Sequence, residues 1–157
     1  MNHDFDTSIL NIADDFYEAY LRCSEGKNPT VDEFNRTRYE VANVPAIVNG
    51  AFAMELYIKS ISRVGKRQLW KKKHNLKELL LTLDQQLQDE IREAVEPKLE
   101  RYQTYEECLD GINNAFVFWR YIHTKQDFGF GLNNTLKVLP IFLDVIREIA
   151  KRAENTK

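Results

Sequence analysis

The sequence predicts an all-α fold, a compact bundle of about five main helices. Apolar residues recur at the three- and four-residue spacing of helices along nearly the whole chain, and no stretch alternates long enough to predict a strand. The chain contains only six glycines and four prolines, too few for a succession of tight hairpins. Its 157 residues are close to the usual size of one domain, so we expect a single domain over residues 1–157.

The first expected helix runs from Phe5 to Cys23, where apolar residues form one stripe. Turn-forming residues follow at positions 24–30. Thr30 and Glu33 then have the spacing of a capping box, which predicts a short helical turn over Val31 to Arg36.

The most apolar helix is expected next, from about Pro45 to Arg63. Proline is tolerated in a first helical turn because its missing N–H would have no intrahelical partner there. Gly65 is well placed to end this helix. Two apolar stripes run along the segment, a pattern typical of a helix at the centre of a bundle.

Asn75 is expected to cap a further helix, which opens at Leu76 and has Glu78 in its first turn. An amphipathic helix from Gln86 to Val95 follows, and Pro97 ends it.

A second capping box, Thr104 with Glu107, predicts a helix that reaches about Lys125. Residues 128–134 contain two glycines and are expected to form a loop. A last helix then begins near Thr135 and takes Pro140 into its early turns.

Basic residues are concentrated in one segment of a chain whose net charge is only −2. Eight of the 22 lysines and arginines lie between Leu56 and Lys77, a segment without any acidic residue. This excess favours an anionic partner such as RNA or a nucleotide. The alternative is a solvated loop and helix end, because basic side chains are favoured near a helix C-terminus. The expected RNA-binding residues are Lys59, Arg63, Lys66, Arg67, Lys71, Lys72 and Lys73.

The residues present argue against several functional classes. Cys23 and Cys108 lack metal-binding or redox spacing, no phosphate-binding glycine loop or nucleophile elbow occurs, and the three histidines are not spaced as metal ligands. We therefore expect neither a metal nor a cofactor. No apolar run approaches the roughly 18 residues of a membrane span, and the acidic N-terminus is atypical of a signal peptide, which together predict a cytoplasmic protein.

Polar residues within apolar helix faces mark a candidate site. Arg120 and His123 project from the apolar face of one predicted helix, about one turn apart. Glu55 is the only charged residue between Glu40 and Lys59, and it lies between the two stripes of the central helix. Antiparallel packing of these helices would pair Glu55 with Arg120. The pair is either a structural ion pair or part of a cleft where Arg120 binds phosphate and His123 transfers protons.

The helix that carries Arg120 also has apolar side chains on its opposite side, at Val117, Phe118 and Tyr121. A chain of this size rarely buries one helix all round, so we expect a homodimer that covers part of this surface. The alternative is that the first and last helices of the same chain cover it.

Three segments resemble the HEPN superfamily, the nucleotide-binding domains of higher eukaryotes and prokaryotes. They are AFAMELYIKSI (51–61), HNLKELLLTL (74–83) and NNAFVFWRYIHTK (113–125), and their order also matches, so the resemblance covers roughly residues 40–125. It implies an all-α bundle of four to five main helices that commonly dimerises. Many members are metal-independent endoribonucleases of toxin–antitoxin, abortive-infection or other defence systems. Other members have lost activity and bind RNA, nucleotides or partner proteins.

Catalytic members carry an arginine followed by a histidine after about four to six intervening residues, whereas only Tyr121 and Ile122 separate Arg120 from His123. We therefore favour a non-catalytic HEPN-like domain that binds RNA, nucleotide or a partner protein, such as a cognate antitoxin, in a bacterial defence or toxin–antitoxin system. A metal-independent endoribonuclease that uses Arg120 and His123, with Glu55 beside them, is the second hypothesis. A purely structural, dimeric interaction domain is the third.

Overall fold

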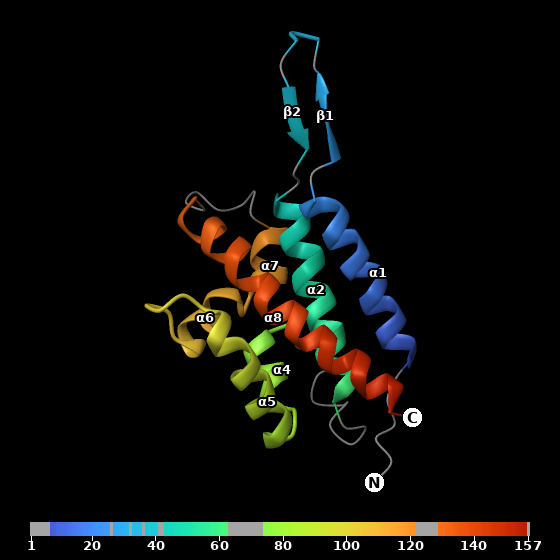
Figure 1. The fold of residues 1–157 in the computed structure, drawn as a ribbon, viewed down its shortest axis with the longest axis vertical. Coiled ribbons are helices and arrows are strands. Elements are labelled where there is room, and N and C mark those ends of the chain that lie inside the picture. The colour runs from blue at the N-terminus through green and yellow to red at the C-terminus, as the bar shows by residue number, and fades with distance from the viewer. Residues whose placement is uncertain are drawn as a thin grey trace.

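A computed structural model of the chain describes residues 7–25, 27–31, 33–35, 37–40, 43–62, 74–121 and 129–156. Within these ranges the all-α prediction is confirmed, and one small hairpin is added to the helices (Figure 1). None of the described helices has both the length and the apolar character that crossing a membrane requires.

Helix α2 (Asn43–Ile61) is the centre of the bundle, as its two apolar stripes predict. It packs against α1 (Thr7–Ser24), α4 (Leu76–Leu80), α7 (Ala115–Arg120) and α8 (Gly129–Asn155). Figure 1 shows α1 and α8 flanking α2. Twelve of its 19 residues are buried, so substitutions along α2 act on the core rather than on the surface.

Helices α5 (Gln85–Val95) and α6 (Tyr105–Ile112) form the other side of the bundle, where both contact α8. A single 3₁₀ turn (Glu96–Lys98) follows α5. The start of α6 is the predicted capping box: the Glu107 N–H donates to Thr104 Oγ1 at 3.2 Å, and the Thr104 N–H donates to Glu107 Oε2 at 3.1 Å.

A polar cluster ties α1, α2 and α8 together. The Tyr57 hydroxyl on α2 donates to Asp14 Oδ1 on α1 at 2.7 Å, and Lys151 on α8 forms an ion pair with the other oxygen of Asp14. The Arg147 guanidinium lies 4.3 Å from the centre of the Tyr17 ring. Burial, reinforced by the hydrogen bond to Asp14, raises the pKa of Tyr57 above its ordinary value. The phenol therefore remains a donor that holds α1 in place.

Residues 27–40 differ from the prediction, which placed a helical turn over Val31 to Arg36. The chain instead forms an antiparallel hairpin of β1 (Lys27–Val31) and β2 (Thr37–Glu40), which projects from the helices (Figure 1). Asn35 adopts a φ of 60°, a left-handed conformation that asparagine tolerates and that a helical turn excludes.

The helix predicted to run from Thr104 to about Lys125 is interrupted, because α6 ends at Ile112 and α7 begins at Ala115. Asn113 lies at the break and satisfies the first N–H groups of α4. Its carbonyl oxygen accepts from the Leu76 N–H at 3.0 Å, and its Oδ1 accepts from the Lys77 N–H at 2.7 Å. The predicted cap is also formed, since the Glu78 N–H donates to Asn75 Oδ1 at 3.0 Å. The residue that separates α6 from α7 therefore also caps α4.

The last helix begins earlier than predicted, at Gly129 rather than near Thr135, so the loop expected over 128–134 is wrong for residues 129–134. A Cβ atom added to Gly131 would lie 3.8 Å from the Trp119 ring, which shows that this first part of α8 packs on α7. Packing thus overrides the weak helix propensity of glycine. Thr135 Oγ1 donates to the Gly131 carbonyl oxygen at 2.8 Å, one turn back.

Replacing Asn113 with alanine should remove one of the caps of α4 and lower the free energy of unfolding by about 1 kcal/mol. Urea denaturation followed by circular dichroism measures this loss. Asn114→Ala is the matched control, because Asn114 is exposed and its side chain makes no capping hydrogen bond. Equal losses for the two variants would show that the Asn113 side chain does not stabilise α4.

Candidate functional site

The candidate site is built around Glu55, a fully buried carboxylate on α2. Lys59 lies one turn further along the same helix and donates a hydrogen bond to Glu55 Oε1. His74, just before α4, places Nδ1 3.2 Å from Oε1 and 3.1 Å from Oε2. A carboxylate buried in this way is stabilised only by such donors, since water does not reach it.

His74 differs from its two partners in its exposure. Its side chain is 48% exposed, whereas Lys59 as a whole residue is only 8% exposed. Because the ionised Glu55 accepts but cannot donate, Nδ1 carries the proton in their hydrogen bond. His74 is therefore held by one ring nitrogen at the edge of the core, with part of its ring facing solvent.

Arg120, at the end of α7, is exposed and surrounded by aromatic rings. Its guanidinium carbon lies 5.3 Å from the centre of the Phe116 ring and 4.8 Å from that of Tyr121, whose hydroxyl accepts a hydrogen bond from the arginine. Phe116 is anchored by Phe52 of α2, with ring centres 4.7 Å apart in a stacked arrangement. The position of the cation is thus set by the core.

The expected ion pair between Glu55 and Arg120 is not formed, because Lys59 and His74 occupy the carboxylate. The Phe116 ring is instead the contact that His74 and Arg120 share: its centre is 5.5 Å from that of the His74 ring and 5.3 Å from the guanidinium carbon of Arg120. Lys59 lies four residues after Glu55 on the same helix and reaches the carboxylate directly. This spacing explains why Lys59, rather than Arg120, pairs with Glu55.

The other predicted site residues are only partly located. His123 lies outside the described residues, and so do Arg63, Lys66, Arg67, Lys71, Lys72 and Lys73. Lys59 is described, and it is buried beside Glu55 rather than placed at an RNA-binding surface.

Sequence reasoning missed His74 as a member of this cluster. A local signal was present: Glu55 and Lys59 have ion-pair spacing on the central helix, and the Asn75 cap places His74 directly before α4. The missing information was which helix α4 packs against, and this depends on the Asn113 contacts.

Known proteins offer no further assignment. No family model, curated protein or solved structure matches this chain. The HEPN resemblance therefore stays a prediction, and the site is argued from its own geometry. Nor do the described residues contain a group of three histidine, cysteine or acidic side chains placed to hold a metal ion.

Replacing Glu55 with alanine should leave Lys59 buried without its carboxylate and lower the free energy of unfolding by about 3–5 kcal/mol. The matched control is Glu93→Ala, which removes an exposed carboxylate from α5 and should change stability by less than about 0.5 kcal/mol. Urea denaturation of both variants gives the comparison. A loss for Glu55→Ala as small as that of the control would contradict a structural role for the cluster.

Proposed function

We propose that the protein is a non-catalytic helical domain that binds RNA. The observation that supports this most is the state of Arg120: it is exposed, stacked on aromatic rings, and makes no ion pair with any described carboxylate. A guanidinium of this kind binds phosphate through its N–H groups and offers a planar face to an unstacked base.

The basic segment, residues 63–73, also supports RNA binding. Residues 63–73 contain six lysines and arginines and no acidic residue. The residues that flank the segment are Ser62, directly after α2, and His74, which binds Glu55. Six basic residues are therefore joined in sequence to the two elements that hold the Glu55 cluster, and such a concentration of positive charge favours phosphate.

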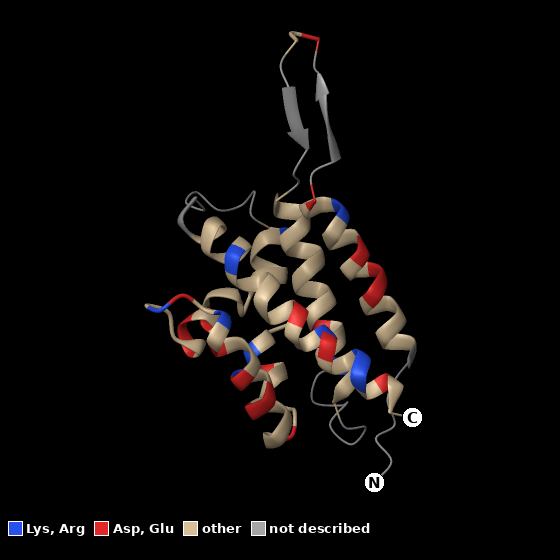
Figure 2. Cartoon of the chain, in the orientation of Figure 1, with Lys and Arg blue, Asp and Glu red and all other residues tan. Residues whose placement is uncertain are grey.

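The distribution of acidic residues favours this face over α1. Figure 2 shows acidic residues along α1, whereas α7 has none. Phosphate groups are repelled by such an acidic helix, so RNA approaching the protein is directed away from α1. A net charge of −2 conceals this difference between faces.

A non-catalytic role is favoured by the state of Glu55. The carboxylate is fully buried and holds two partners, so it is not available to take a proton from a substrate. The two-residue gap between Arg120 and His123 agrees with this interpretation.

A metal-independent endoribonuclease is the second candidate, and one contact favours it. Glu55 holds Nδ1 of His74 while the ring is half exposed, the arrangement by which a carboxylate orients a catalytic histidine. Such a histidine would take the 2′-hydroxyl proton or protonate the leaving oxygen, and Arg120 would stabilise the charge on phosphorus.

Substituting Arg120 with alanine should weaken binding of single-stranded RNA about tenfold, because a phosphate and stacking contact is lost. Fluorescence anisotropy with a labelled oligonucleotide at two salt concentrations measures the affinity. Arg101→Ala serves as control, since Arg101 is an exposed arginine outside the site.

Reversing Lys71, Lys72 and Lys73 to glutamate should also flatten the salt dependence of RNA binding. If neither Arg120→Ala nor the triple lysine variant changes the affinity for RNA, RNA binding at this surface is refuted.

Incubation of labelled RNA with the purified protein in EDTA distinguishes the two candidates. We expect intact RNA. Cleavage that is lost in both Arg120→Ala and His74→Ala would instead establish the nuclease and overturn the non-catalytic proposal. Loss in His123→Ala rather than His74→Ala would assign the proton transfer to His123.

The proposed protein partner is a second copy of the chain. Val117 on α7 and Tyr121 directly after it are 41% and 44% exposed and form an apolar surface beside Arg120. Light scattering should give about twice the 18.5 kDa chain mass, and Val117→Asp should return it to one chain mass. Ile12→Asp, at a similarly exposed position on α1, should leave the dimer intact. A monomeric parent protein at micromolar concentration would refute the dimer.

A further inference from the structure

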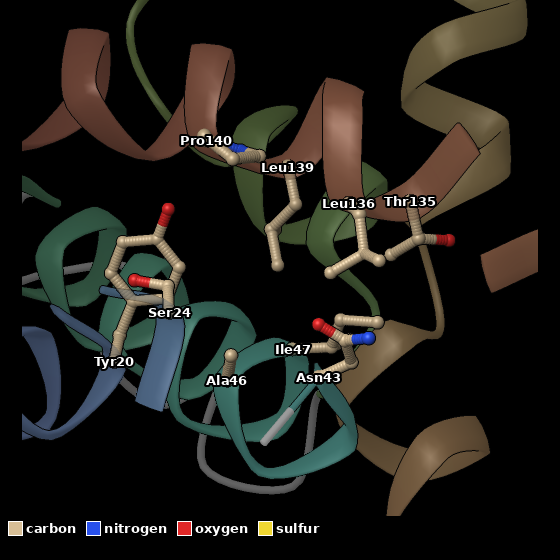
Figure 3. Close-up of a pocket in the computed structure, with 9 residues that line it drawn as sticks. All are labelled: Tyr20, Ser24, Asn43, Ala46, Ile47, Thr135, Leu136, Leu139 and Pro140. Carbon is tan, nitrogen blue, oxygen red and sulfur yellow. The ribbon is translucent and has the colours of Figure 1, made fainter. Parts of the chain in front are cut away.

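A cavity of about 250 Å³ opens at the opposite half of α2 from Glu55, between α1, α2 and α8 (Figure 3). It lies where α1 ends and α2 begins, the part of the bundle from which the hairpin projects (Figure 1). It shares no residue with the site around Glu55 and Arg120.

The cavity begins where close packing of the three helices ends. At Gly50 a Cβ atom would lie 3.0 Å from Cδ2 of Tyr20 and 3.3 Å from Cδ2 of Leu139, so α1, α2 and α8 leave no free space there. One turn earlier on α2, at Ala46 and Ile47, the helices no longer fill the space between them. The small side chain of Ala46 contributes directly to the free volume.

The wall of the cavity is mainly apolar, and the described residues that line it carry no charge. Ala46, Ile47 and Leu139 are each about 1% exposed, and no lysine, arginine, aspartate or glutamate is among the lining residues that the structure describes. Figure 3 shows Leu136 and Leu139 directed from α8 toward Ile47 and Asn43 of α2. A charged ligand would lose its hydration there without gaining a partner, so the cavity selects a neutral ligand.

Two of the lining residues bear on the hydrogen bonds that an occupant could make. The side-chain amide of Asn43 forms no hydrogen bond with a described residue. The Leu136 carbonyl lies one turn before Pro140, which has no N–H to donate to it. An occupant with a hydrogen-bonding group at its edge would give the Asn43 amide the partner that no described residue supplies.

We propose that this cavity binds a small, neutral, mainly apolar molecule of the size of a bicyclic aromatic ring, with a hydrogen-bonding edge toward Asn43. The volume supports this size, because an apolar protein cavity of about 150 Å³ holds a single benzene ring. The site is independent of RNA binding, and its occupant contacts α1, α2 and α8 together.

Indole is a suitable probe, having one N–H on a bicyclic apolar ring. Titration of the ¹⁵N-labelled protein should give saturable amide shifts at residues 43–50 and 135–141, and binding should raise the melting temperature. Ala46→Leu should abolish these shifts by filling the cavity. Ala153→Leu, a matched substitution at a half-buried position near the end of α8, should leave them unchanged.

Asn43→Ala keeps the proposal testable if Ala46→Leu fails to fold. Asn43 is at the first turn of α2, and its replacement should weaken indole binding about threefold to tenfold. Absence of saturable shifts at millimolar indole would overturn the proposal. Shifts confined to other surfaces, or binding that survives filling of the cavity, would overturn it equally.

Discussion

The Glu55 carboxylate has no contact with solvent, and a carboxylate in that position is stable only when donors surround it. Lys59 supplies one donor from the same helix, and His74 supplies the other from the residue pair that precedes α4. The second contact fixes the start of α4 against α2. Asn113 then caps α4 and at the same time separates α6 from α7. The direction of α7, and with it the position of Arg120, therefore follows from how one buried charge is satisfied.

The two halves of the central helix α2 differ in their surroundings. Its C-terminal half holds the charged cluster, which lies beside the aromatic rings that support Arg120. Its N-terminal half lines an uncharged cavity. Gly50 lies between them, where side chains of α1 and α8 pack directly on α2. The two proposed ligands differ accordingly, since an exposed arginine suits phosphate and an uncharged wall suits a neutral molecule.

Local chemistry explains which parts of the fold could be predicted from the sequence. The cap at Asn75 and the capping box at Thr104 depend on residues three apart in the chain, and both are formed as predicted. The apolar stripes of α2 likewise predict its burial. The start of α8 was not predictable, because glycine-rich residues become helical there by packing on Trp119. His74 was missed as a partner of Glu55 for the same reason, because their contact joins segments 19 residues apart in sequence.

A double-mutant cycle on Glu55 and His74 tests the central contact most directly. The free energy of unfolding at pH 7 is measured by urea denaturation for the parent, Glu55→Gln, His74→Ala and the double variant. If the histidine is held by the buried carboxylate, the double variant should lose about 1–3 kcal/mol less stability than the sum of the two single losses. A coupling of this size is expected for residues in direct contact. Losses that add to within about 0.5 kcal/mol would contradict the account, because α4 would then be positioned without this hydrogen bond.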